Sequence, residues 1–171
     1  MTGLAWKLLA HLRDAATTED WRTVLQEFTR LGPPSVSLHL AVLVEPYLEF
    51  ILDGLKTVES RFSIRPIPPY RRVEPQDVVL LKASGGPVVG AFTVSAVWHY
   101  RLDPASWSEV RRDFAAALCA QSGFWDERAT AEYATLLRIS DVRRLAPVIL
   151  PKKDRRGWVI LADRSKGGRL L

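Results

Sequence analysis

Lys56, Glu59 and Arg61 lie close together in the sequence, and their types and spacing suit the binding of a charged ligand. A strand that begins near Thr57 sends alternate side chains to opposite faces, so Glu59 and Arg61 share a face with Cα atoms about 7 Å apart. Lys56 belongs to the preceding turn and is expected to lean over the same face. Two cations around one carboxylate suit a nucleotide, because the cations contact phosphate while the carboxylate accepts from an exocyclic amine or a ribose hydroxyl. The alternative is a solvated strand edge, where an ion pair contributes only about 0 to 1 kcal/mol.

A helix, a glycine and a strand are the elements that must position these charges. Residues 46–53 predict a short helix with Pro46 at its first position and with Tyr47, Phe50 and Ile51 on one buried stripe. Gly54 follows where a left-handed residue closes a helix at least steric cost. The charged residues therefore follow a sharp turn.

This segment resembles a known motif. The pattern Gly-x-Lys-x-x-Glu-x-Arg, present as Gly54, Lys56, Glu59 and Arg61 directly after the predicted helix, is similar to the signature of the ASCH domain family. ASCH domains belong to the PUA-like superfamily of small β-barrels implicated in RNA binding. The resemblance covers about residues 36–161 in the order of elements. It implies an α+β fold, a PUA-like small mixed β-barrel with flanking helices.

The chain is expected to divide into three parts. Residues 1–34 form an N-terminal helical extension, residues 35–162 the ASCH barrel and residues 163–171 a flexible basic tail. Apolar residues of the extension recur at helical spacing and must be buried against the barrel or the preceding helix; in the second helix they are Trp21, Val24, Leu25, Phe28 and Leu31, and in the first Trp6, Leu8, Leu9 and Leu12. A homodimer contact through these helices is the alternative.

The rest of the core alternates strands with one long helix. The apolar run 36–44 predicts a buried first strand in which His39 is a core or strand-edge residue and not a catalytic base. Residues 77–82 and 88–100 predict a hairpin. Asp103 and Pro104 begin a helix that is expected to reach about residue 122. Strands are expected over 133–142 and 158–161.

Two basic segments extend the predicted interface. The proline-rich loop 65–72 is expected to contribute phosphate contacts and a stacking face, with Tyr133 as another stacking residue. A second cluster precedes the last strand and is expected to border the Lys56 surface, since first and last strands of PUA-like barrels lie near each other. The nucleic-acid-binding residues predicted in these segments are Arg65, Arg71, Arg72, Lys152, Lys153, Arg155 and Arg156, and Thr57 is predicted beside Lys56. The alternative is a set of unrelated surface loops.

Composition favours a polyanionic partner. Among 171 residues, 24 Lys and Arg exceed 19 Asp and Glu, which gives a net charge of +5. Cys119 is the single cysteine, so we expect a reducing, cytoplasmic setting. No metal-ligand spacing, cofactor motif or membrane-spanning apolar run is found in the sequence, and we expect none of these partners.

Three functions fit these features. The first is an RNA or single-strand binding module that uses the Gly-x-Lys-x-x-Glu-x-Arg cleft. The second is a hydrolase that acts on RNA, as a ribonuclease does, or on a modified nucleoside. Lys56 and Glu59 would be its catalytic residues, with Glu59 as the general base and Lys56 holding developing negative charge. Some small ASCH-type proteins are N4-acylcytidine amidohydrolases that use a threonine three residues after the lysine, but Glu59 occupies that position here and Thr57 is only one residue away. The third is an interaction protein that assembles through its helical extension.

Overall fold

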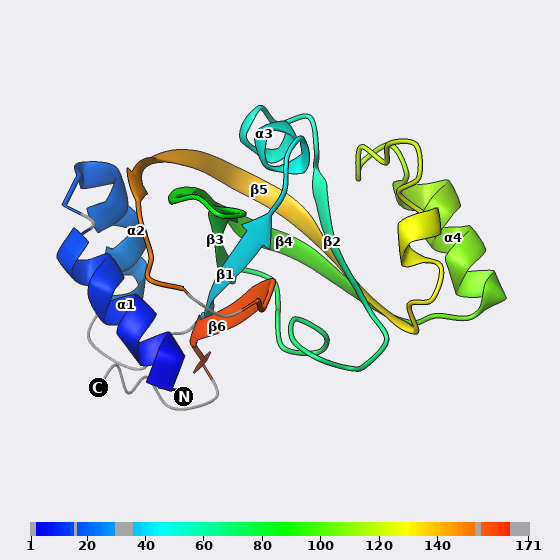
Figure 1. Ribbon diagram of the computed structural model, residues 1–171, viewed down its shortest axis with the longest axis horizontal. Helices are drawn as coiled ribbons and strands as arrows, with labels where there is room; N and C mark the ends of the chain where they lie inside the picture. The colour runs from blue at the N-terminus through cyan, green and yellow to red at the C-terminus, as the bar shows by residue number, and fades with distance from the viewer. Residues whose placement is uncertain (1–2, 16, 30–35, 153–154, 165–171) are drawn as a thin grey trace.

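A curved six-stranded sheet forms the centre of the computed structural model, which describes residues 3–15, 17–29, 36–152 and 155–164 (Figure 1). The strand order is β2-β5-β4-β3-β1-β6, so β2 and β6 are the two edges of the described sheet. β1 and β3 run parallel and the other neighbouring pairs are antiparallel. The predicted α+β fold is confirmed, with a sheet that curls into a half-barrel. The strands are β1 (Leu38–Leu43), β2 (Val58–Ser63), β3 (Val78–Ala83), β4 (Val88–Arg101), β5 (Tyr133–Val148) and β6 (Trp158–Ala162).

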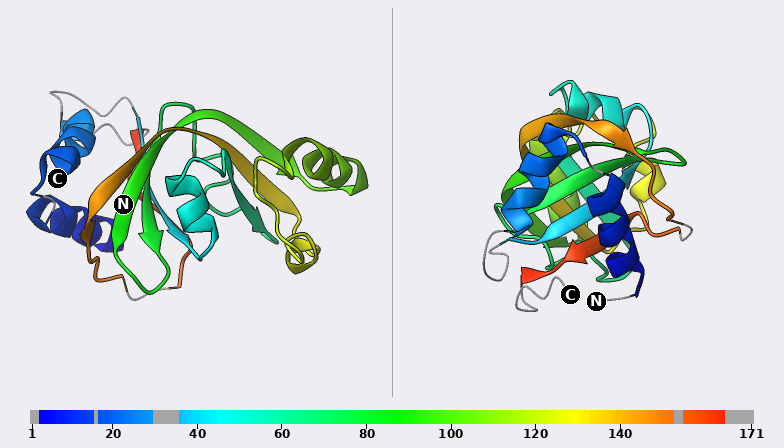
Figure 2. Two further views of the ribbon diagram at one scale, coloured as in Figure 1. Left: turned by 90° about the horizontal axis from the view of Figure 1, so that it is seen from above. Right: turned by 90° about the vertical axis from the view of Figure 1, so that its left-hand side faces the viewer.

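Helices lie at both ends of this sheet. Figure 1 and the two views in Figure 2 show α1 and α2 over one end and α4 at the opposite end, while α3 lies beside the middle of the sheet. None of the helices in the described part of the chain is long and apolar enough to span a bilayer. The helices are α1 (Gly3–Ala15), α2 (Glu19–Thr29), α3 (Tyr47–Leu52) and α4 (Pro104–Phe114), with a 3-10 turn at Asp126–Arg128.

The two N-terminal helices complete the core at their end of the sheet. Leu8, Leu12, Trp21 and Val24 are at most 2% exposed and pack with residues of β1, β3 and β6. Trp21 Nε1 also donates to the Ala146 carbonyl at 2.7 Å. The prediction that this stripe is buried against the barrel is confirmed, so these side chains do not need a dimer partner to cover them. Leu31 and the side chains of Trp6, Leu9 and Phe28 lie outside the described part.

Two elements differ in length from their predictions. β5 extends to Val148 instead of 142, because the long, bulged β4 pairs with it as far as Val88. α4 ends at Phe114 instead of about 122, and the next residues form turns in which Cys119 adopts φ 52°. Ala120 N donates to Ala115 O and Cys119 N to Ala116 O, the pattern of a Schellman ending.

A buried polar group links β1, β6 and the segment before β3. His39 is fully buried, with Nε2 3.1 Å from Asp77 Oδ2, and Trp158 Nε1 donates to His39 Nδ1 at 3.2 Å. Burial acts to raise the pKa of Asp77, but hydrogen bonds from His39, Ser37 N and Glu74 N lower it overall. His39 is therefore the core residue that the sequence predicted.

The first residues of the segment assigned to a basic tail contact the barrel. Asp163 pairs with Arg72 at 2.6 Å, and Arg164 forms ion pairs with Glu74 and Asp77. The assignment of 165–171 to a flexible tail lies outside the described residues.

Candidate functional site

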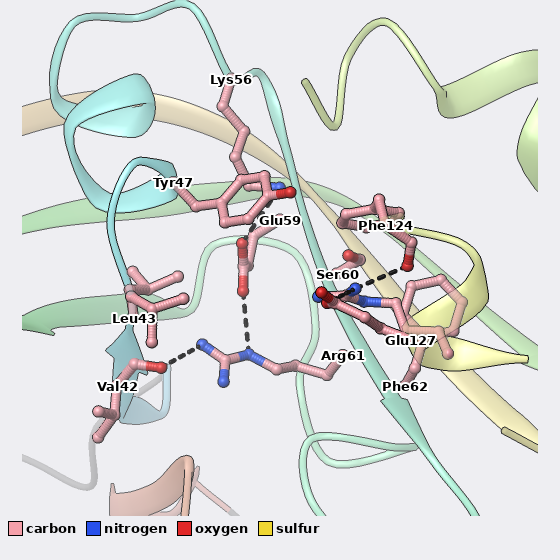
Figure 3. Close-up of a pocket in the computed structure, with 12 residues that line it drawn as sticks. Val42, Leu43, Tyr47, Lys56, Glu59, Ser60, Arg61, Phe62, Phe124 and Glu127 are labelled. Atoms are coloured by element: carbon pink, nitrogen blue, oxygen red, sulfur yellow. Dashed lines mark hydrogen bonds and ion pairs between the residues drawn. The ribbon is translucent and has the colours of Figure 1, made fainter. Parts of the chain in front are cut away.

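Lys56, Glu59 and Arg61 converge as the alternation predicted, and they form a buried ion network (Figure 3). Lys56 Nζ lies 3.4 Å from Glu59 Oε2, and Arg61 Nε lies 3.0 Å from Glu59 Oε1. The second contact is an ion pair without the alignment of a hydrogen bond. The side chains of Lys56 and Glu59 are only 2% and 4% exposed, and that of Arg61 is 21% exposed. A solvated strand edge is thus not what the structure contains.

The turn after α3 fixes the position of Lys56. Gly54 adopts φ +74°, Gly54 N donates to Ile51 O and Leu55 N to Phe50 O, which is the left-handed helix ending that the sequence predicted. Lys56 N then donates to the same Phe50 carbonyl at 2.8 Å. The backbone around Lys56 is therefore held before its side chain makes any contact.

The end of the α4 segment holds the Lys56 amine. Leu118 O accepts from Lys56 Nζ at 3.2 Å, and the neighbouring Ala117 O accepts from Thr57 N and Val58 N. Carbonyls at a helix C-terminus lack partners within the helix and favour a nearby cation. Burial nevertheless lowers the pKa of Lys56, and the charge of Glu59 opposes this shift in part.

Arg61 crosses the seam of the half-barrel, by which we mean the gap between the two edge strands, β2 and β6. Its Nη1 donates to Gly157 O at 3.2 Å and its Nη2 to Val42 O at 3.1 Å, so it joins β2 to the start of β6 and to β1. Its guanidinium also lies over the ring of Trp158, 5.3 Å from the centroid. Trp158 Nε1 donates to His39 Nδ1, so the buried His39–Asp77 group fixes the ring on which Arg61 lies.

A cavity of about 380 Å³ opens in front of these charges, and we call it the first cavity. Tyr47, Phe62 and Phe124 give it aromatic walls (Figure 3). Arg128 adds a cation, whose Cζ lies 3.8 Å from the centroid of the Phe124 ring. The residues that line the cavity are Val42, Leu43, Val44, Tyr47, Lys56, Glu59, Ser60, Arg61, Phe62, Phe124, Glu127 and Arg128.

Some lining residues were missed by the sequence analysis. Tyr47 was assigned to a buried stripe, and the spacing of α3 gave no sign that it also faces a cavity. Ser60, Phe124 and Arg128 were not singled out; the last two are far from β2 in the sequence and approach it only in the folded chain. Ser60 lies on β2, an edge strand that is paired only with β5 in the described sheet, and residues of both faces of β2 line the cavity.

Several predicted contacts lie away from the first cavity. Thr57 and Arg65 are exposed and do not line it. Arg71 lies over the Tyr70 ring, with its backbone N bound to His99 Nδ1 at 3.3 Å, and Arg72 pairs with Asp163. Loop 65–72 was expected to lie beside the site. Its apolar residues 67–70 do so, because they line a second recess together with Arg61.

The second recess has a volume of about 180 Å³ and shares Arg61 and Phe62 with the first cavity. Tyr133, predicted as a stacking residue, lines this recess. Its ring packs edge-on against Tyr70 with centroids 5.1 Å apart. The lining residues are Arg61, Phe62, Ser63, Ile67, Pro68, Pro69, Tyr70, Tyr133, Ala134, Thr135, Gly157 and Trp158.

A third hollow, here called the basic cavity, collects the cluster before β6. Lys152, Arg155 and Arg156 line it together with Lys82, in a volume of about 570 Å³ that shares Val42 with the first cavity. Burial, together with the charge of Lys152, lowers the pKa of Lys82. Lys153, the other predicted member of the cluster, lies outside the described residues. The structure thus brings the cluster next to the Lys56 site without merging the two.

A mixed half-barrel with flanking helices and a buried ion network at its seam defines a small α+β domain of barrel type. The crystal structure of ASCH from Zymomonas mobilis has a similar fold, with a TM-score of 0.60 and 16% identity over 75% of this chain and 91% of that chain. Two mutant forms of that protein give TM-scores of 0.58 and 0.56 at 17% and 18% identity, again over 75% of this chain and over 93% and 91% of theirs.

The described domain therefore has an ASCH-like fold, as the motif implied. No protein-family model matches the sequence, and no curated protein sequence matches it significantly. At the identities of the solved structures the likeness concerns the fold alone.

Proposed function

We propose that this protein binds RNA or single-stranded DNA and that one nucleotide enters the first cavity beside Lys56, Glu59 and Arg61. The observation that carries the proposal is the buried ion network at the wall of a cavity of about 380 Å³. That volume falls in the range of about 300 to 1,000 Å³ typical of small-ligand sites. A fold shared with PUA-like domains supports the same conclusion.

The lining chemistry suits both halves of a nucleotide. Arg61 and Arg128 offer guanidinium groups to a phosphate, while Tyr47 and Phe62 offer aromatic rings to a base. Glu59, held by two cations, accepts hydrogen bonds from an amine or a ribose hydroxyl. A nucleotide carries both phosphate oxygens, which accept hydrogen bonds, and amine or hydroxyl groups, which donate them. A site that holds cations and a carboxylate together suits such a ligand.

Neighbouring cations extend the interface beyond one nucleotide. The first cavity and the basic cavity share Val42, so Lys152, Arg155 and Arg156 lie next to the bound nucleotide. We assign to them the phosphates of the flanking strand. Exposed Arg65 and Arg71 are further candidates at the other side of Arg61.

Binding across a salt series tests the proposal. Lys56→Met removes the charge but keeps apolar bulk, and Arg101→Met is the matched control, because Arg101 is exposed and lines none of the three cavities. With fluorescently labelled single-stranded RNA, duplex RNA and single-stranded DNA, wild-type affinity should fall steeply as salt rises. Lys56→Met should weaken single-strand binding about tenfold or more, on the scale of a lost charged hydrogen bond, while Arg101→Met changes it little. Equal affinities for wild type and Lys56→Met would refute the assigned site.

Hydrolysis of the bound strand is a second candidate, favoured by a buried lysine of lowered pKa beside a carboxylate. Glu59 would act as the general base and Lys56 would hold the developing negative charge. The amidohydrolase variant fits less well, since Glu59 stands at the threonine position and Thr57 is exposed outside the first cavity. Product analysis of the same mixtures decides between the two. Cleavage by the wild type that is lost in Glu59→Gln protein shown to be folded by circular dichroism would establish an enzyme, and intact RNA would support binding without hydrolysis.

A further inference from the structure

We propose that the second recess binds the base adjacent to the one in the first cavity, so that the smallest ligand to fill the site is a dinucleotide. Its linking phosphate then lies against Arg61. This inference rests on the proposed function and specifies its ligand.

The volumes of the two hollows indicate a main site and a subsite. The first cavity, about 380 Å³, is in the range of sites that enclose a whole small ligand, and the second recess, about 180 Å³, is below it. The two share Arg61 and Phe62. A ligand that fills both must therefore pass over Arg61.

The walls of the second recess suit a flat aromatic group. Tyr70 and Tyr133 stand edge to face at 5.1 Å between centroids, and Pro68, Pro69 and Trp158 complete an apolar surface. Proteins that bind single strands use such ring faces to stack bases without reading their sequence. Among the described residues, Arg61 is the one Lys or Arg that lines the second recess. Arg61 also lines the first cavity, so this cation lies at the boundary between the two hollows.

The wall formed by loop 65–72 is fixed before any ligand arrives. Tyr70 packs against the His99 ring at 5.4 Å, and Arg71 N donates to His99 Nδ1 at 3.3 Å. His99 lies on β4, so the loop is tied to the sheet. A preformed wall loses little conformational entropy when a base stacks on it.

Arg61 is held in the geometry that a bridging phosphate needs. Each of its terminal nitrogens donates once, Nη1 to Gly157 O and Nη2 to Val42 O, and each carries a further N–H for a ligand. Glu59 and the Trp158 ring fix the guanidinium from two other sides. A phosphodiester that links two nucleosides would receive these N–H groups between the two hollows.

Titrations with short ligands test the inference. The probes are the four nucleoside 5′-monophosphates, the dinucleoside monophosphates ApA, CpC, GpG and UpU, and each dinucleotide with one base replaced by an abasic site. A dinucleoside monophosphate carries less negative charge than a 5′-monophosphate, so a gain in affinity cannot come from charge. We expect the best dinucleotide to bind at least fivefold more tightly, since stacking of one base is worth roughly 5- to 150-fold. The abasic ligands should lose this gain.

Variants locate the gain in the second recess. Tyr133→Ala should remove the dinucleotide advantage, measured as the ratio of dinucleotide to monophosphate affinity, whereas Tyr133→Phe keeps the ring face and should retain the wild-type ratio. Tyr100→Ala is the control, because Tyr100 is on the paired strand but lines neither hollow. If Tyr133→Ala does not fold, the abasic ligands on wild type carry the test.

The outcomes separate this inference from the proposed function. Equal affinity for mono- and dinucleotides, together with RNA binding that depends on Lys56, would overturn the dinucleotide site and keep the proposed function. A dinucleotide advantage that survives Tyr133→Ala in a folded protein would also overturn it. Absence of binding by every probe and by longer RNA would overturn both.

Discussion

Glu59 is the residue on which the ion network depends, because it is the carboxylate that both Lys56 and Arg61 contact. Taking charges out of water is costly, and removal of one partner of a buried pair leaves the other uncompensated. Lys56 would keep only the Leu118 carbonyl as a hydrogen-bond acceptor in the described network. Glu59, in contrast, would keep Arg61 if Lys56 were replaced. The two substitutions should therefore differ in cost.

We predict that Glu59→Gln lowers the free energy of unfolding by about 3 to 5 kcal/mol, the usual cost of breaking a buried ion pair. Lys56→Met should cost clearly less, and the double variant should be more stable than Glu59→Gln alone because no unpaired ammonium remains. Urea unfolding at pH 7 of the wild type, both single variants and the double variant forms the required cycle. Additive costs in that cycle would show that Lys56 and Glu59 are not coupled.

For Lys56, Glu59 and Arg61 the sequence predicted that the side chains meet, but it did not predict how far they are buried. Strand alternation placed Glu59 and Arg61 on one face, and Gly54 placed Lys56 beside them. Burial depends on Leu118 and Phe124, which belong to the turns that follow α4. No local pattern reports such a contact, so a buried network and a solvated ion pair have the same sequence signature.

The proline-rich loop and β4 are coupled through His99. Burial lowers the pKa of His99 from its usual 6.5, the nearby charge of Arg71 lowers it further, and a hydrogen bond with Val73 acts in the opposite direction. Its Nδ1 accepts from Arg71 N, which requires that nitrogen to be unprotonated. His99 therefore binds a proton less readily in the folded state than in the unfolded state. Between pH 6.5 and the lowered pKa of His99, the unfolded state holds more protons.

The stability of the protein should consequently fall as pH drops from about 6.5 through the lowered pKa of His99. His99→Phe keeps a ring against Tyr70 but cannot titrate, so its stability should fall less over the same range. Urea midpoints at steps between pH 8 and pH 5 check this, and the difference between the two proteins cancels the contributions of groups that both proteins share. Parallel pH profiles would mean that His99 is not held in the neutral form.

Element types were more predictable than element lengths. The apolar run of β1, the β3–β4 hairpin and the Asp103 cap of α4 all carry local signals, and each is found in the structure. The extension of β5 is set by pairing with β4, where Gly90 faces Arg144 and a Cβ at residue 90 would come within 2.6 Å of Leu52 Cδ2. Such a constraint involves three elements and cannot be read from one of them.

At the scale of the whole molecule, the part of the core that the N-terminal helices cover and the first cavity are at different places. α1 and α2 cover one end of the sheet, and their buried residues belong to a cluster that includes none of the residues lining the first cavity. The three hollows adjoin one another, because the first cavity shares Arg61 and Phe62 with the second recess and Val42 with the basic cavity. A change at the helical end should therefore affect folding more than binding.

Trp21 offers the sharpest test of this separation, because it is fully buried and its indole N–H is bound to Ala146 O. We predict that Trp21→Ala lowers the free energy of unfolding by about 3 to 5 kcal/mol, as for other buried tryptophans. Trp21→Phe, which keeps most of the apolar area and loses the hydrogen bond, should cost less. Urea unfolding measures the cost, and RNA binding is compared at a temperature where circular dichroism shows each variant folded. There both variants should bind as the wild type does. A folded Trp21→Ala protein with tenfold weaker binding would instead place the helical extension in the nucleic-acid interface, and an unchanged urea midpoint would show that α2 does not anchor the barrel.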